Sequence, residues 1–376
     1  MLTNYLYFIS ALMIVCGHLI QKDEGELVQL SIIFRHGART TDNFYPNDPH
    51  KNLTFYPIGL GGLTPEGKYG EYALGKYFRK YYGQFLGETY SEKDIFVRST
   101  DYIRTRMSAQ LVMTGLFPPK YKQTWHPEIN WQPIPIDYKL RTADDFLHRR
   151  HNCPFFETAT EAMDNIIEIK KKYIEPHSEL FEFLRKESGL SIKNPYALLQ
   201  FYFILNTESE MNLTLPKWTN SIFPDKIYKL SVAAYEYQNF IPEVRKINSG
   251  YLFKKILQDA ETKMTDTENK KSYKALFYSG HEITIGFMLN ALGVDQNSIP
   301  KYSSALIFEL RKKNNSYFIK LRYRKNINDN EPMNLKVPGC DTLCPIEQFK
   351  KLYEELLPII SMEDACRQDY TSNHLK

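Results

Sequence analysis

Arginine and histidine residues follow an apolar run near the start of this chain, in an order that suits phosphate chemistry. The set is Arg35-His36-Gly37-Ala38-Arg39, directly after Phe34. A neutral imidazole is a nucleophile that can attack phosphorus and form a covalent intermediate. Arginine offers a planar, permanently charged fork that matches phosphate oxygens. His36 is therefore a candidate nucleophile between the candidate phosphate ligands Arg35 and Arg39, although a histidine after a strand can also be a structural hydrogen-bonding group.

Two later segments repeat this arrangement of polar groups after an apolar run. Arg98 precedes Ser99-Thr100-Asp101, a helix-capping signal, and His281 and Glu282 precede a second helical pattern. Unpaired N–H groups and the positive dipole end make a helix N-terminus favourable for anions. We therefore take Arg98 and His281 as further phosphate ligands and Glu282 as a proton donor to the leaving oxygen. Glutamate is in any case favoured in the first turn of a helix.

The elements that must position these residues are short strands followed by helices. Apolar, β-branched runs predict strands over residues 27–34, 94–98 and 273–278, and ligands of open α/β sheets bind beyond such strand ends. Thr64 and Pro65 predict the start of a helix that continues to about Tyr82. Further helices are predicted from residue 103 to Pro118-Pro119, with Arg104 and Arg106 in ion pairs, and over 283–292. A hairpin is predicted over 304–323.

The hydrophobic pattern of the sequence changes between residues 137 and 262. This stretch shows long amphipathic helical patterns in place of the alternation of strand and helix. We interpret it as a mostly helical cap inserted into an α/β core of residues 23–136 and 263–376. Trp218 in this region is expected to pack in a core.

Composition and hydropathy limit the compartment and the partners. The 376 residues carry a net charge of +4 with an isoelectric point near 8.5, which suits anionic small molecules and is too weak to indicate nucleic acid. The uncharged run over 5–17 predicts a signal peptide, residues 1–22, cleaved between Cys16 and Lys22; the alternative is a buried N-terminal helix. No later apolar run is long enough to anchor the chain in a membrane.

The cysteines and glycosylation triplets agree with export. Cys153, Cys340, Cys344 and Cys366 remain after cleavage, and four cysteines in an exported protein indicate two disulfides with three pairings open. Cys340 and Cys344 could close a small loop; the alternative, a zinc site, lacks the usual additional ligands. Acceptor triplets for glycosylation begin at three positions, Asn52, Asn212 and Asn314.

Several segments together resemble the histidine acid phosphatases of the phosphoglycerate-mutase-like superfamily, most of all the insect venom group. These segments are 34–39, 98–105, 215–218, 279–282 and 338–345. The resemblance implies an α/β fold with a mixed, largely parallel sheet, helices on both faces and a smaller, mainly helical cap domain. It also implies His36 as the phosphorylated nucleophile, no cofactor or metal, the disulfides Cys340–Cys344 and Cys153–Cys366, and a homodimer.

The chain departs from the family pattern at three positions. Ala38 stands where many members carry an acid, Thr41 where many carry proline, and Glu282 where most carry aspartate. The first two positions hold no phosphate-contacting group, so we expect these differences to adjust the activity and not to abolish it. The third difference bears on the identity of the proton donor.

We therefore predict a secreted acid phosphatase that hydrolyses small phosphomonoesters through a phosphohistidine. One alternative is a phytase or phosphotransferase of the same superfamily. Another is a venom or salivary binding protein that has lost catalysis, although a binding protein needs no nucleophile.

Overall fold

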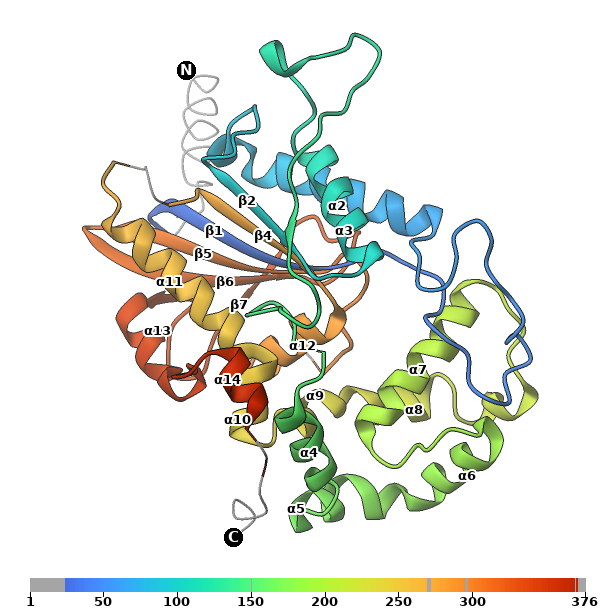
Figure 1. Cartoon of the computed structure of the whole chain (residues 1–376). Helices are drawn as coiled ribbons and strands as arrows, with labels where there is room; N and C mark the ends of the chain where they lie inside the picture. The colour runs from blue at the N-terminus through green and yellow to red at the C-terminus, as the bar shows by residue number, and fades with distance from the viewer. Residues whose placement is uncertain (1–23, 150, 269–271, 295–296, 369, 371–376) are drawn as a thin grey trace, which may run out of the picture.

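A mixed β-sheet with helices on both faces forms the centre of the molecule (Figure 1). The computed structural model describes residues 24–149, 151–268, 272–294, 297–368 and 370. The predicted signal peptide, residues 1–22, lies outside these residues. The α/β fold expected from the sequence is confirmed.

The sheet has eight strands in the order β3-β2-β4-β1-β5-β6-β7, with β8 paired to β6. Strands β3, β2, β4 and β1 are mutually parallel, and the pairs of β1 with β5 and of β5 with β6 are antiparallel. Most strands therefore run in the same direction as β1. The strands are β1 (Glu26–Arg35), β2 (Ile95–Ser99), β3 (Asp137–Tyr138), β4 (Ala275–Gly280), β5 (Ala305–Lys313), β6 (Ser316–Arg324), β7 (Met333–Leu335) and β8 (Leu343–Pro345).

Strand β1 lies in the middle of the sheet and is buried on both faces. Leu30, Ile32 and Phe34 pack with helices α2 (Pro65–Leu86) and α3 (Ile103–Leu116). Ile33 points to the opposite face, which α11 (Tyr251–Thr265), α12 (Glu282–Ala291) and α13 (Ile346–Leu352) cover. A strand covered on both sides reads as a continuous apolar run, which is why the sequence pattern located β1.

The helices next to the candidate residues begin as the local sequence indicates, with one exception. The Thr64 side chain accepts a hydrogen bond from the Gly67 backbone N–H at 3.1 Å, so the predicted cap of α2 is confirmed, and this helix runs one turn further than Tyr82. The capping signal before α3 is wrong, because Tyr102 occupies the N-cap position and makes no side-chain cap. The Thr100 hydroxyl is instead bonded to Thr105.

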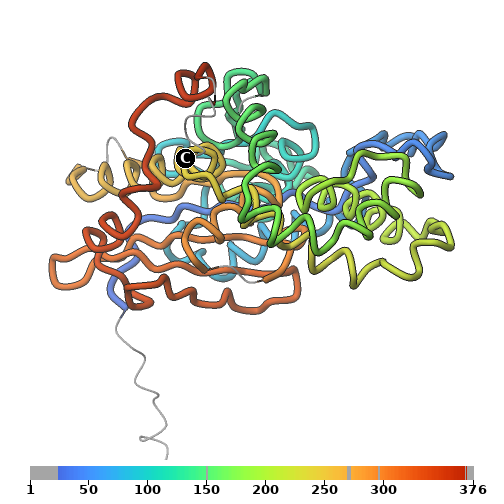
Figure 2. Tube along the Cα trace, turned by 90° about the horizontal axis from the view of Figure 1, so that it is seen from below, coloured from blue at the N-terminus to red at the C-terminus, as the bar shows by residue number. Residues whose placement is uncertain are grey.

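The cap is a set of helices beside the carboxyl ends of the parallel strands, and the loop over residues 41–62 runs along it (Figures 1 and 2). Tyr45 of this loop is buried against Phe201 and Trp218, so Trp218 packs in a core as predicted. The helices between β3 and α11 are α4 (Pro154–Met163), α5 (Ile167–Ile169), α6 (Ser178–Ser188), α7 (Pro195–Glu210), α8 (Asp225–Val232), α9 (Ala234–Gln238) and α10 (Pro242–Arg245).

Both predicted boundaries of the cap differ from the structure. Strand β3, at the start of the predicted 137–262 insertion, pairs with β2 in the sheet. Helix α11, most of which lies before residue 262, packs its buried face, including Phe253 and Ile256, on the sheet. An amphipathic helix presents the same sequence pattern whether its apolar face meets a sheet or another helix, so periodicity could not separate the two.

Two disulfides are present, with the pairing expected from the resemblance; one joins segments far apart in the sequence and the other closes a short loop. Cys153, just before α4, is bonded to Cys366 in α14 (Met362–Arg367), and Cys340 is bonded to Cys344. The three asparagines of the glycosylation triplets are exposed. Within the described part of the chain, no helix combines the length and the apolarity needed to cross a membrane.

Candidate active site

The carboxyl ends of two adjacent parallel strands bring the predicted catalytic residues together. Arg35 of β1 is in register with Gly280 of β4, and the His36 backbone N–H donates to the Gly280 carbonyl at 3.1 Å. The residues that follow the two strands therefore meet. One ligand-type atom from each of His36, His281 and Glu282 lies within 4.8 Å of the others. The structure thus brings three of the predicted site residues together.

The ring of His36 is held in one orientation by its own neighbour. Its Nδ1 lies 2.8 Å from the Gly37 carbonyl oxygen, which can only accept a hydrogen bond, so Nδ1 carries the proton. The lone pair of a neutral ring is then on Nε2. Gly37 is required here, because a Cβ at this position would lie 2.2 Å from the Gly67 carbonyl oxygen at the start of α2.

The surroundings keep His36 neutral. The side chain is buried, and burial together with the positive charges of Arg104, Arg35 and Arg39 holds its pKa well below the usual value. Neighbouring His281 adds to this effect. A histidine whose pKa is strongly lowered retains its nucleophilic lone pair in acid solution.

Arg35 is fixed on the side of the site that faces the cap. Its Nη1 donates to the Pro300 carbonyl at 2.6 Å, and its guanidinium lies over the rings of Tyr302 and Phe203, at 3.8 and 5.3 Å. The Nε of Arg35 is 3.8 Å from a carboxylate oxygen of Glu282. Arg35 therefore contacts both Glu282, the predicted proton donor, and Phe203 of the cap.

Arg39 and Arg104 share the carboxylate of Asp42, a contact that the sequence analysis did not predict. Asp42 forms ion pairs with both, at 3.0 Å from Arg39 Nη2 and 2.9 Å from Arg104 Nη1. Arg104 is the charge that most lowers the pKa of His36 after burial, and the same holds for His281. The predicted ion pair of Arg104 thus exists, but it holds the guanidinium beside the histidines.

Arg98 is placed differently from the prediction. Its guanidinium is 2.8 Å from Asp137, 3.1 Å from Asp145 and 3.7 Å from the buried Asp144. It is not among the charges that shift the pKa of His36 or His281. With three carboxylates around it, Arg98 joins β2 to β3 and to the segment that follows β3, which is a structural contact.

His281 is held by a chain of hydroxyl groups. The Thr105 hydroxyl is 3.0 and 2.9 Å from the carbonyl oxygens of Thr100 and Tyr102, to which it can only donate. It can therefore accept from the Thr100 hydroxyl at 2.9 Å, and Thr100 in turn accepts from His281 Nε2 at 3.0 Å. In its neutral form His281 has no second N–H for a phosphate oxygen; as an imidazolium it has one.

The cluster also has ligand types that a divalent cation accepts, namely two imidazoles and a carboxylate. The field around it opposes a cation, because Arg35, Arg39 and Arg104 all lower the pKa values of both histidines. The same field favours an anion. The arrangement therefore fits a phosphate group better than a metal ion.

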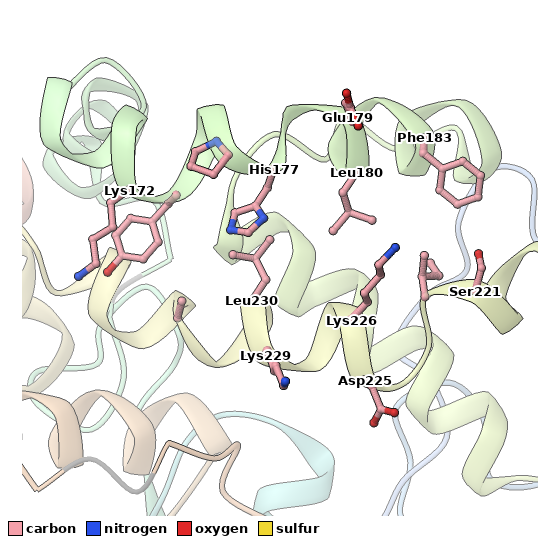
Figure 3. Close-up of a pocket in the computed structure, with 14 residues that line it drawn as sticks. Lys172, His177, Glu179, Leu180, Phe183, Ser221, Asp225, Lys226, Lys229 and Leu230 are labelled. Atoms are coloured by element: carbon pink, nitrogen blue, oxygen red, sulfur yellow. The ribbon is translucent and has the colours of Figure 1, made fainter.

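A pocket of about 440 Å³ adjoins Arg35 and offers space for a leaving group. It is bordered by Tyr202 and Tyr228 from the cap and by Tyr302 and Asn326 from the core. Tyr302 also contacts the His36 ring, with the centroids 5.7 Å apart. A larger pocket of about 890 Å³ lies between α6 and α8, and Leu180 and Leu230 are among the residues that line it (Figure 3). None of the predicted site residues lines it.

The sequence profile of the histidine phosphatase superfamily (branch 2) matches residues 26–324, a span that contains His36, Arg104 and His281. The chain belongs to this superfamily.

Relatives within the histidine phosphatase superfamily cover most of the chain. Venom acid phosphatase Acph-1 of Apis mellifera is 36% identical, covering 89% of this chain and 86% of that protein. Prostatic acid phosphatase of Rattus norvegicus is 33% identical, with 93% and 91% covered. The solved phytase of Hafnia alvei in complex with tartrate has a TM-score of 0.66 at 18% identity, with 91% and 98% covered, and shows the shared fold.

For this histidine phosphatase, sequence reasoning missed Arg104, Asp42 and Tyr302. Arg104 carried a usable signal, since it lies in the first turn of a helix whose N-terminus faces the site. Asp42 and Tyr302 lie outside the regular elements around the site, and nothing local marked them.

Proposed function

We propose that the protein is an acid phosphatase that hydrolyses small phosphomonoesters through a phosphohistidine on His36, without a metal ion. The observation that carries this proposal is the neutral His36 ring, whose Nδ1 is bonded to Gly37 while Nε2 remains free among arginines. Arg104 takes the role of third arginine that the sequence analysis gave to Arg98. The phosphomonoester substrate agrees with the named activities of the relatives.

In the first half-reaction, His36 Nε2 attacks phosphorus and the bond from phosphorus to the ester oxygen breaks. The leaving alkoxide needs a proton, and Glu282 in its protonated form supplies it. Arg35, Arg39 and Arg104 stabilise the charge on the phosphoryl oxygens, a role that metal cations have in other phosphoryl-transfer enzymes. A bound dianion also favours the imidazolium form of His281, which would then donate a hydrogen bond to it.

In the second half-reaction, water attacks phosphorus and the bond between phosphorus and His36 Nε2 breaks. The Glu282 carboxylate accepts the proton from the water, so the acid of the first step is the base of the second. Inorganic phosphate then leaves, and His36 and Glu282 return to their starting protonation states.

Export is part of the same proposal. The two disulfides and the exposed acceptor asparagines support an oxidising, extracellular location, and a homodimer stays a prediction from the resemblance. Light scattering of the secreted protein would measure its mass, and a monomer would refute the dimer.

Turnover of 4-nitrophenyl phosphate in acid with excess chelator tests the proposed activity. The wild type should be active, His36→Ala inactive yet folded, and His151→Ala, a control at an exposed histidine, unchanged. Acid quenching with ³²P-labelled substrate should trap label on the wild type only. Loss of activity with chelator, restored by metal, would refute the metal-free mechanism, and labelling of His36→Ala would move the nucleophile elsewhere.

A further inference from the structure

A second guanidinium, that of Arg141, lies next to the phosphate site, over an aromatic ring that also carries Arg104. The half-buried Tyr102 ring carries Arg104 at 4.7 Å from its centroid and Arg141 at 5.1 Å. The same ring meets His281 edge-on, with centroids 4.8 Å apart. Tyr102 therefore holds one arginine that acts on His36 and another that reaches outward.

Arg141 lacks a carboxylate partner among the described residues, unlike Arg39, Arg98 and Arg104. Arg39 and Arg104 share Asp42, and Arg98 is surrounded by Asp137, Asp144 and Asp145. Along the described chain, no Asp or Glu lies within ion-pair distance of the exposed Arg141. Its charge is thus available to an anion from solution.

His148 also links Arg141 to the site, because it lies beside His281 and Tyr102 and the charge of Arg141 acts on it. The His148 ring is 5.3 Å from His281 and 6.0 Å from Tyr102, centroid to centroid. Burial lowers the pKa of His148 to about 4, and the charges of Arg149, Arg104 and Arg141 act in the same direction. His148 is therefore neutral at mildly acidic pH, and Arg141 supplies the outer positive charge beside it.

We propose that Arg141, positioned by Tyr102, is a second anion subsite that selects phosphomonoesters whose leaving group carries another phosphate group. This inference rests on the proposed phosphatase activity and specifies its substrates. While the scissile phosphate lies among Arg35, Arg39 and Arg104, the second phosphate binds the guanidinium of Arg141, which matches phosphate oxygens in a bidentate manner. The stack on Tyr102 limits the motion of the arginine and lowers the entropy lost on binding.

Arg106, two residues after Arg104 in α3, is a matched control. Arg106 lies over the Tyr138 ring at 4.7 Å, which repeats the stack of Arg141, but Arg106 has Asp101 at 3.9 Å. Arg106→Gln therefore removes a stacked arginine that already has an acidic partner. It should affect both kinds of substrate equally and weakly.

The first experiment compares fructose 1,6-bisphosphate with fructose 6-phosphate as substrates of the wild type, Arg141→Gln and Arg106→Gln. We expect Arg141→Gln to lower kcat/KM for the bisphosphate by about tenfold, through KM, and to change the monophosphate less than about twofold. Arg141→Lys should retain part of the preference, since it keeps the charge and loses the planar fork. Equal losses on both substrates, or a similar loss in Arg106→Gln, would overturn the subsite.

The second experiment measures binding, so that the subsite is tested apart from turnover. In the His36→Ala background, calorimetry should show tighter binding of the bisphosphate than of the monophosphate, and Arg141→Gln should remove the difference. If the wild type hydrolyses neither ester while this difference is present, the proposed function fails and the subsite stands. If affinity for the two esters is equal, the subsite fails whatever the turnover.

Discussion

Replacing Arg104 and Arg98 separately by glutamine is the sharpest test of which arginine acts in the site. Arg104→Gln removes a cation that lies beside both histidines but leaves Arg35 and Arg39 in place. Removal of one preorganised donor from a transition-state charge typically costs about 10²–10³-fold in kcat. Because two arginines remain, we expect about 10²-fold. Stability should change little, since Asp42 keeps its contact with Arg39.

Arg98→Gln should show the opposite pattern. It leaves the buried Asp144 without its cation, and breaking a buried ion pair typically costs about 3–5 kcal/mol. Asp137 and Asp145 are half-exposed and add little to this, so we expect a loss of about 3–5 kcal/mol in the free energy of unfolding and a Tm lower by about 5 °C. Activity per folded molecule should stay within about threefold of the wild type.

The pH profile gives an independent readout on Arg104. Its charge lowers the pKa of His36, so Arg104→Gln should raise that pKa. Because the reaction needs the neutral ring, the acidic limb of kcat/KM should move to higher pH. The assay is steady-state hydrolysis of 4-nitrophenyl phosphate from acid to neutral pH, with thermal unfolding of each variant. Inactive, fully stable Arg98→Gln beside active Arg104→Gln would refute the assignment and restore Arg98 to the site.

Three further predictions concern the proton donor, a disulfide and a buried acid. Glu282→Gln should slow alkyl phosphates by about 10²–10⁴-fold and aryl phosphates far less, and equal losses would exclude Glu282 as the donor. Replacing Cys153 and Cys366 together by serine should lower the unfolding free energy by about 2–5 kcal/mol in denaturant titration, and an unchanged midpoint would contradict this. Burial raises the pKa of Glu71 to about 8, so its protonated form is favoured in the folded state, and Tm should fall as pH rises from about 4.5 to 8. Glu71→Gln should flatten that decline, and an identical pH dependence in this variant would show that other groups cause it.

The parts of the fold and site that the sequence predicted are those set by local patterns. Strand β1 follows from its apolar run, the start of α2 from Thr64 and Pro65, and the hairpin turn from two asparagines, Asn314 and Asn315, with positive φ of 48° and 63°. His36 and His281 were found because parallel strands deliver the residues after them to one edge.

What the sequence did not reveal depends on contacts between distant segments. The aspartates around Arg98 come from residues 137–145, a segment that begins as β3 at the edge of the sheet. Its sequence has no periodicity that would predict a strand there. Thr100 fits a capping pattern, yet its hydroxyl is used by His281 and Thr105. In both cases a locally plausible role was replaced by a tertiary partner.

The bond from His36 Nδ1 to the Gly37 carbonyl has a stereochemical consequence. A ring held in this way can receive the phosphoryl group only on Nε2, so the protein should form a single isomer of phosphohistidine, which phosphorus NMR of the trapped intermediate can distinguish. The ring also cannot turn between the two displacements. Water must then approach from the side that the alcohol has left, and each in-line step inverts the phosphorus centre. Two inversions at one fixed ring give net retention, so a substrate made chiral with oxygen isotopes and transferred to an alcohol acceptor should keep its configuration.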